Sequence, residues 1–126
     1  MTAIDLSPVI PAGRQLIERY SARGFRVSGV IHPGPVIVFP DRTLAWEASG
    51  PAAISVANLA PVVAHGGVRI LLLGMGQRMS PVAPSLRAAL RREGIALEPM
   101  DTGAACRTFN VLLGEDRMVA AALLPP

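Results

Sequence analysis

The sequence predicts a three-layer α/β domain with a mixed central sheet, in which an antiparallel β-meander precedes a βαβαβ unit. Short strand-like runs separated by proline and glycine fill residues 15–48, whereas strand-like and helix-like segments alternate over residues 55–124. Hydrophobic residues make up 51% of the 126 residues, which predicts a packed core rather than disorder. We therefore expect residues 1–126 to form a single domain, with residues 1–13 as a loose lead-in.

The first half of the chain has the pattern of short antiparallel strands. Apolar and polar residues alternate over residues 24–30, which is the period of a half-buried strand. The His-Pro-Gly-Pro segment at residues 32–35 predicts a turn, because proline and glycine fix backbone angles that a strand does not use. Residues 36–39 form a β-branched apolar run that ends at Pro40, and residues 43–46 predict a further short strand.

The second half begins after Gly50-Pro51 with a predicted helix and a buried strand. Ser55 is a suitable N-cap for a helix that ends near His65, where two glycines follow. Residues 68–73 are nearly all apolar, as expected for a strand that is covered on both faces.

The remaining elements alternate in the same way. A helix is predicted over residues 83–93, where Gly94 ends it, and a strand over residues 95–99. A second helix over residues 101–114 and a last strand over residues 117–124 complete the pattern. Such alternation predicts parallel strands joined by right-handed helical crossovers.

The charge distribution argues against nucleic-acid binding. All twelve basic residues are arginine, the formal net charge is +3, and the arginines are scattered along the sequence, with Arg91-Arg92 as the only adjacent pair. Binding of nucleic acid favours a basic stripe or aromatic stacking platforms. The aromatic residues are only Tyr20, Phe25, Phe39, Trp46 and Phe109.

The sequence also lacks the signals of secretion, membrane insertion and metal binding. A single cysteine, Cys106, forms no internal disulfide, and the N-terminus has no basic region followed by an apolar one. No apolar run reaches the roughly twenty residues that a transmembrane helix needs. We therefore expect a cytoplasmic protein without a transmembrane segment. No zinc-ligand spacing, Walker loop or Gly-x-Ser-x-Gly motif is present, so no cofactor is expected.

A candidate binding crevice lies where two parallel strands end. Ligands of open α/β sheets favour the carboxyl ends of the strands, and here these ends are followed by Gly74, Met75 and Gly76 and by Asp101 and Thr102. The first loop has the beginning of a dinucleotide fingerprint but lacks its third glycine, which favours a simple turn. Asp101 is more readily explained as a helix cap than as a catalytic acid or base.

The helix predicted over residues 101–114 presents two different faces. Cys106, Phe109 and Leu113 have the spacing of a buried stripe, which makes Cys106 an expected core thiol. Arg107 and Asn110 lie on another face and complete the candidate crevice, because both offer specific hydrogen-bonding groups. Pairing of Arg107 with Glu115, Asp116 or a loop carbonyl is an equally good explanation, so its role stays open.

One long block of the sequence resembles a known family. The chain is similar, from about residue 17 to residue 124, to the small α/β domain family that includes mitochondrial NADH dehydrogenase (complex I) assembly factor 3 and the adipogenesis-associated domain protein. The clearest match is the Met-Asp-Thr…Ala-Cys-Arg-Thr-Phe-Asn-Val-Leu block at residues 100–112, followed by Glu-Asp-Arg at residues 115–117. Further matches are Tyr20, Gly24, Phe25, Gly29, residues 36–38, Pro40, Trp46, residues 72–76 and residues 121–123.

The resemblance implies the same three-layer fold and a role without catalysis. Its best-described member helps to assemble a membrane complex through protein contacts, so a protein partner is expected. The family often has Gly-Thr-Gly where this chain has Gly74-Met75-Gly76, and the missing hydroxyl argues against chemistry that depends on it. The resemblance thus favours an assembly or interaction module. A small-molecule-binding protein or weak enzyme that uses the crevice is the alternative, and a homo-oligomer stays open.

Overall fold

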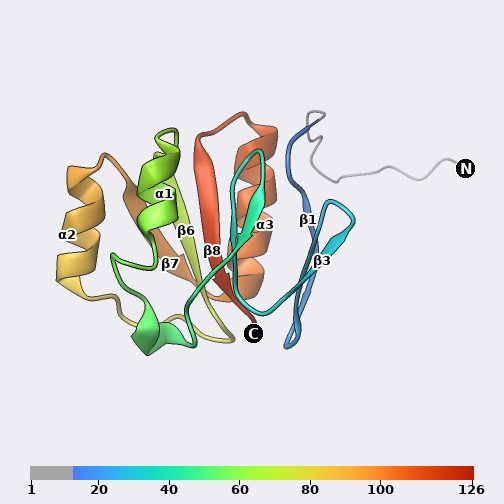
Figure 1. Ribbon diagram of the computed structural model, residues 1–126, viewed down its shortest axis with the longest axis horizontal. Coiled ribbons are helices and arrows are strands. Elements are labelled where there is room, and N and C mark those ends of the chain that lie inside the picture. The colour runs from blue at the N-terminus through green and yellow to red at the C-terminus, as the bar shows by residue number, and fades with distance from the viewer. Residues whose placement is uncertain (1–12) are drawn as a thin grey trace, which may run out of the picture.

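Two β-sheets and three α-helices make up the part of the chain that the computed structural model describes, residues 13–126 (Figure 1). All but the last residue of the predicted lead-in, residues 1–13, lies outside the described residues. The smaller sheet contains β1 (Ile17–Ser21), β2 (Gly24–Val27) and β3 (Val30–Pro33), in that order. The larger sheet has the order β5 (Thr43–Ala45), β4 (Val36–Val38), β8 (Val119–Leu124), β6 (Ile70–Met75) and β7 (Ala96–Met100).

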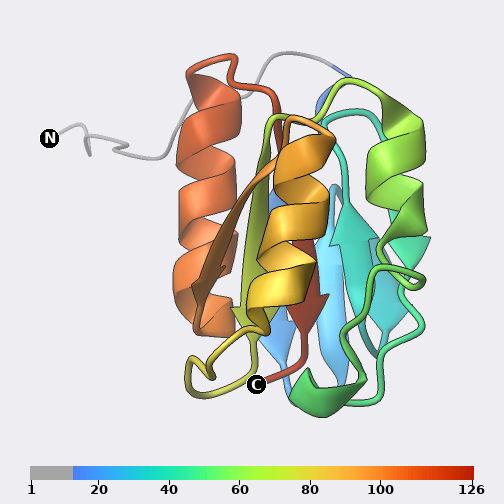
Figure 2. The ribbon, with the colours of Figure 1, turned by 90° about the vertical axis from the view of Figure 1, so that its left-hand side faces the viewer.

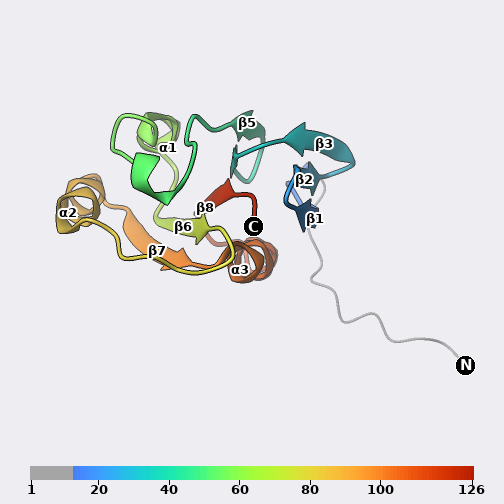
Figure 3. The same cartoon turned by 90° about the horizontal axis from the view of Figure 1, so that it is seen from below.

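The larger sheet is mixed and forms the middle of three layers. Strands β7, β6 and β8 run parallel, whereas β4 pairs antiparallel with both β8 and β5. The helices α1 (Ala60–His65) and α2 (Pro84–Arg92) pack on one face of this sheet. The helix α3 (Thr102–Gly114) and the smaller sheet pack on the other face (Figures 2 and 3). The predicted fold class is therefore confirmed.

The pattern of side chains along the central strands explains why both faces are covered. In β6, Leu71 and Leu73 face α1 and α2, whereas Leu72 faces α3 and the smaller sheet. Every residue of β8 is buried, and three of them are alanines (residues 120–122). Small side chains at the centre of the sheet leave room for larger ones from the layers above and below, such as Phe109 of α3.

The predicted antiparallel meander is divided between two sheets. Among the described residues, strands β1, β2 and β3 pair only with one another, whereas β4 pairs with β8 in the larger sheet. The prediction of one strand over residues 24–30 is wrong, because Ser28 and Gly29 take positive φ values of 46° and 82° and form a tight turn. As a result His32 and Pro33, predicted to lie in a turn, belong to β3.

The helix predicted from Ser55 to His65 is shorter than expected. Residues 56–59 form turns, and α1 begins only at Ala60, next to Pro61. Proline in the interior of a helix would clash with the preceding turn, but it is tolerated in the first turn, where Pro61 is the second residue. Ser55 still accepts a hydrogen bond from the Asn58 amide at 3.2 Å, so it stabilises the turn that precedes the helix.

Candidate functional site

The loop between β7 and α3 is built around Asp101, which caps the helix. Its backbone is extended (φ −66°, ψ 157°), and its carboxylate accepts a hydrogen bond from the Ala104 N–H at 2.9 Å. This bond satisfies one of the amide groups that a helix leaves free at its N-terminus. The predicted capping role of Asp101 is therefore confirmed.

Thr102 closes the space between the ends of β6 and β8. Its side chain is fully buried, and its hydroxyl accepts a hydrogen bond from the Gly76 N–H at 2.9 Å while it donates one to the carbonyl oxygen of Leu124. Its own N–H donates to the Gly76 carbonyl at 2.8 Å. The hydroxyl thus bonds to a donor just after β6 and to an acceptor at the end of β8, so it bridges the ends of these two strands.

Gly74 shows how tightly the ends of these strands pack. A Cβ atom at this position would lie 2.8 Å from Cδ2 of Leu123 and 3.1 Å from both Cα and Oγ1 of Thr102. At Gly76 the φ of 94° requires a backbone conformation that favours glycine. These glycines therefore serve close backbone packing and a turn, as the simple-turn interpretation predicted.

Met75 points to the opposite face of the sheet from Gly74. It is buried with Leu71 and Leu73 among the residues that face α1 and α2, and it lines a cavity of about 210 Å³ beneath the short 3-10 helix Pro51–Ala53. The residues of the predicted crevice therefore do not all lie in one place. Gly74, Gly76, Asp101 and Thr102 lie together, whereas the Met75 side chain does not join them.

Asn110 holds the smaller sheet against α3. Its side-chain oxygen accepts a hydrogen bond from the Ile17 N–H at 3.0 Å, and its side-chain nitrogen donates to the Ile17 carbonyl at 2.9 Å. The amide therefore replaces a neighbouring strand at the point where a register shift interrupts the pairing of β1 with β2. The side-chain oxygen and nitrogen of Asn110 thus both hold β1 against α3.

Arg107 is exposed on the same face of α3, one turn before Asn110. Its Nη1 lies 3.4 Å from the hydroxyl of Tyr20, whose ring packs over Gly103. Within residues 13–126 no ion pair joins Arg107 to an acidic side chain; Asp116 instead pairs with Arg14 at 3.0 Å. The structure therefore places Arg107 beside Tyr20 of β1 and above Gly103.

Cys106 has the properties of a core thiol. It is buried with Ala105, Phe109 and Leu113, which confirms the predicted apolar stripe of α3. Burial raises the pKa of the Cys106 thiol to about 12, so the reactive thiolate is scarce at neutral pH. This residue offers no nucleophile to a substrate.

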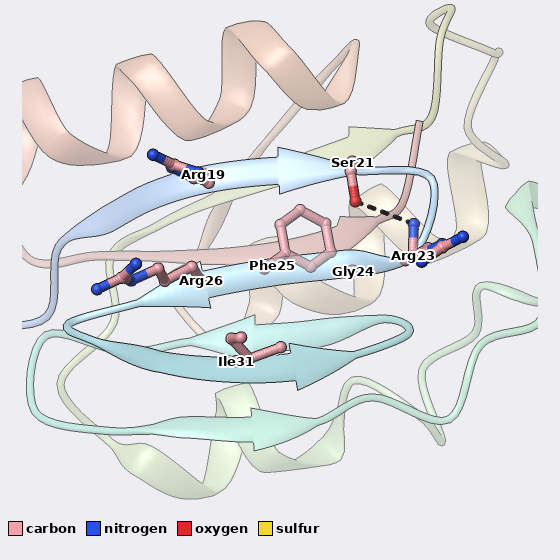
Figure 4. Close-up of a pocket in the computed structure, with 7 residues that line it drawn as sticks. All are labelled: Arg19, Ser21, Arg23, Gly24, Phe25, Arg26 and Ile31. Carbon is pink, nitrogen blue, oxygen red and sulfur yellow. Dashed lines mark hydrogen bonds between the residues drawn. The ribbon is translucent and has the colours of Figure 1, made fainter.

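A surface that sequence reasoning missed lies on the outer side of the smaller sheet (Figure 4). We call it the basic sheet face. It surrounds a shallow depression of about 210 Å³ lined by three arginines, one exposed isoleucine and three further residues: Arg19, Arg23, Arg26, Ile31, Ser21, Gly24 and Phe25.

Pairing of the strands brings these arginines together. Arg19 lies directly opposite Arg26, and Ser21 accepts a hydrogen bond from the Arg23 N–H at 3.1 Å, which orders the turn between β1 and β2. In the sequence these arginines are three or four residues apart, so they form no run of adjacent basic residues. Recognition of the β1–β2 hairpin would have placed Arg19 and Arg26 side by side.

Residues 13–126 contain neither a metal-binding cluster nor a membrane-spanning helix. No group of three or more His, Cys, Asp or Glu side chains is close enough to hold a metal ion. None of the helices in this range is long and apolar enough to cross a membrane.

Residues 17–124 match a family described as protein of unknown function (DUF498/DUF598). NADH dehydrogenase (ubiquinone) 1 alpha subcomplex assembly factor 3 of Xenopus tropicalis is 37% identical over 111 residues, which cover 87% of this chain and 61% of that protein. The chain thus spans less than two thirds of the length of this relative. The protein of the same name from Danio rerio is 35% identical over 126 residues, covering 99% of this chain and 72% of that one.

Bacterial proteins are similar to this chain at comparable sequence identity and coverage. An uncharacterized protein of Rhodobacter capsulatus is 36% identical, with 90% of this chain and 87% of that protein covered. A crystal structure described as an outer membrane protein from Bartonella henselae has a TM-score of 0.83 and 35% identity, covering 94% of this chain and 98% of that one. A Bordetella parapertussis protein has a TM-score of 0.84 at 30% identity, covering 92% of this chain and all of that one.

Proposed function

The chain belongs to the DUF498/DUF598 family of proteins of unknown function, and from this premise we propose that it is a non-catalytic interaction module that helps a larger protein complex to assemble. The observation that carries the proposal is the extent of the similarity to NADH dehydrogenase assembly factor 3, which covers 87% to 99% of this chain in the two vertebrate relatives above. The part shared with an assembly factor is therefore nearly all of the folded chain.

The state of the reactive side chains supports a role without catalysis. The carboxylate of Asp101 caps its own helix, the hydroxyl of Thr102 bridges two strands, and the Cys106 thiol is buried and protonated. Each group is engaged in the fold rather than presented to a ligand. Use of the crevice of Gly74, Gly76, Asp101 and Thr102 by a small molecule would require these contacts to break.

The expected partner is a subunit or assembly intermediate of a membrane-bound respiratory complex, by analogy with the relatives' name. In this proposal the partner meets the chain from the cytoplasmic side of the membrane, and no cofactor takes part. The interaction is between protein surfaces, so it would depend on exposed residues rather than on the closed ends of β6 and β8.

The test is genetic and biochemical in the organism's own cells. Removal of the gene should lower the amount of fully assembled NADH dehydrogenase severalfold on native gels, and a plasmid copy should restore it. Succinate dehydrogenase in the same membranes serves as the control for general loss of respiratory complexes. Unchanged NADH dehydrogenase assembly, together with no stoichiometric partner after crosslinking and native purification, would contradict the proposal.

A further inference from the structure

We propose that the basic sheet face binds an extended acidic segment of a partner protein, which lies beside β3 as an additional strand. This inference rests on the proposed function, since it assigns the surface and the chemistry through which the module would recognise its partner. Three features of the smaller sheet carry it: unbalanced positive charge, an exposed apolar side chain in the same row, and a free strand edge.

Within the described residues, two of the three arginines on this surface lack an acidic partner. Three arginines and no acidic residue line the depression. Arg26 has an ion pair with Glu18 at 3.5 Å, whereas Arg19 and Arg23 have none with the residues that the structure describes. Like charges directly opposite each other in a sheet are destabilising, and Arg19 is opposite Arg26. A carboxylate from a partner would relieve this repulsion and form charge-assisted hydrogen bonds with the guanidinium groups.

The row formed by Arg19 and Arg26 on adjacent strands continues to an apolar side chain on β3. Ile31 is opposite Arg26 on β3 and is 76% exposed, the largest exposure among the large hydrophobic residues of the described chain. Residues opposite each other in adjacent strands point to the same face. A strand added beside β3 would contact Ile31 directly, and its acidic side chains on this face would point across β3 toward Arg26 and Arg19, which suits a segment that combines acidic and aliphatic side chains.

The edge of β3 offers backbone groups for pairing. β3 is the last strand of the smaller sheet, and a two-residue turn at Ser28 and Gly29 joins it to β2. Such a turn makes Val27 and Val30 a hydrogen-bonded pair, so the next pair, Arg26 and Ile31, is a non-hydrogen-bonded one. The N–H and C=O of Ile31 consequently point away from β2, toward the free edge. Addition of a strand at such an edge is a common mode of peptide recognition.

Another arginine-lined hollow on the molecule is a poorer candidate. It has a volume of about 400 Å³ next to β7 and contains Arg69, Arg87 and Arg91. Arg87 donates to the carbonyl of Leu97 at 2.8 Å, and Arg69 donates to the carbonyl of Val68 at 3.2 Å. Glu98 also lines this hollow. Its charge is therefore partly balanced, and its arginines are partly engaged.

The same features favour a peptide over a nucleic acid. Stacking of bases needs exposed aromatic rings, but Phe25 is only 3% exposed and packs in the core with Phe109. Tyr20 points to the other face, toward Gly103 and Arg107. The exposed side chain beside Arg26 is the aliphatic Ile31, and the backbone edge of β3 is suited to pairing with a peptide strand.

The test uses the full chain labelled with ¹⁵N and an eight-residue synthetic peptide that alternates glutamate with valine. Amide shift changes on titration should map to β1–β3, and hydrogen exchange at the Ile31 amide should slow at least tenfold. The double variant R19E/R23E should weaken binding at least tenfold. The matched control R91E/R92E has the same net charge but changes α2, so its affinity should stay within twofold of the unchanged chain.

A backbone variant tests strand addition separately from charge. Ile31→Pro removes the outward N–H but no hydrogen bond to β2, so the chain should fold while the peptide affinity falls at least tenfold. Ile31→Thr keeps the N–H and serves as its control. Circular dichroism of each variant confirms that the fold is retained.

Several results would overturn the inference. The first is that the peptide fails to bind at millimolar concentration, or that its amide shift changes fall outside β1–β3. The second is that the R91E/R92E variant loses as much peptide affinity as R19E/R23E. The third is that an eight-nucleotide single strand, or the same peptide with arginine in place of glutamate, binds more tightly than the acidic peptide. If the R19E/R23E variant still supports NADH dehydrogenase assembly in cells, the basic sheet face is not the partner-binding surface, and the proposed function still stands. Normal assembly without the gene would reject the proposed function itself.

Discussion

Replacement of Thr102 by valine tests whether the ends of β6 and β8 are closed by structure. Valine has nearly the same shape as threonine but no hydroxyl, so Thr102→Val removes the hydrogen bonds to the Gly76 N–H and the Leu124 carbonyl. The Thr102 side chain is fully buried, and the valine methyl group would occupy the space of the hydroxyl, so both groups lose their partner. An unsatisfied buried group costs about 1–3 kcal/mol, so we expect a loss of about 2–4 kcal/mol in the free energy of unfolding.

Two further variants separate the hydroxyl from other effects. Thr102→Ser keeps the hydroxyl and loses one methyl group, which should cost only about 1 kcal/mol. Thr108 lies on the same helix and is half-buried, so Thr108→Val controls for helix propensity and should change stability by less than about 0.5 kcal/mol.

Urea denaturation followed by circular dichroism provides the measurement. With the urea dependence usual for small domains, the midpoint for Thr102→Val should fall by about 1–3 M. A midpoint within error of the unchanged chain would refute the reasoning, as would equal losses for Thr102→Ser and Thr102→Val. Either result would mean that the hydroxyl does not hold the strand ends together, and it would reopen the crevice as a ligand site.

Three other predictions concern single side chains. Asn110→Ala should lower stability by about 1–2 kcal/mol and speed amide exchange at Ile17, because both bonds to that residue are lost; unchanged exchange would contradict the proposed anchoring. Cys106, with its pKa raised to about 12, should react with a thiol reagent at pH 8 only after the chain unfolds, and rapid labelling of the native protein would count against burial. The hydrogen bond from His65 lowers the pKa of Asp41 below its ordinary value of 3.8, so Asp41 should add stability above that pH and lose it as the pH falls through the lowered pKa. Asp41→Asn should remove this part of the acid dependence, measured from melting temperatures between pH 2 and about 6.

Elements with strong local signals were predicted well. The α3 helix has an aspartate cap and an apolar stripe of Cys106, Phe109 and Leu113, and all of these lie where expected. The apolar run after Gly67 became β6, buried on both faces. In these segments the side chains decide both the type of element and the face that is buried, so the sequence alone is sufficient.

Turns with weaker signals were predicted less well. The Ser28-Gly29 turn follows a run in which apolar and polar residues alternate, and a positive φ at serine is uncommon. Pro61 moved the start of α1 because the helix could not extend further toward Ser55. Local pattern and backbone geometry conflict at both places, and geometry prevails.

The sequence by itself determined the fold class, because hydrophobic periodicity and turn residues act between neighbours in the chain. Only the tertiary structure decided which polar groups are free. Thr102, Asn110 and Arg107 look equally available in the sequence, yet Thr102 bridges two strands, Asn110 anchors β1, and Arg107 remains exposed. The basic sheet face also depends on strand pairing. Its arginines lie within residues 19–26, but only the hairpin places Arg19 opposite Arg26 on one face of the sheet.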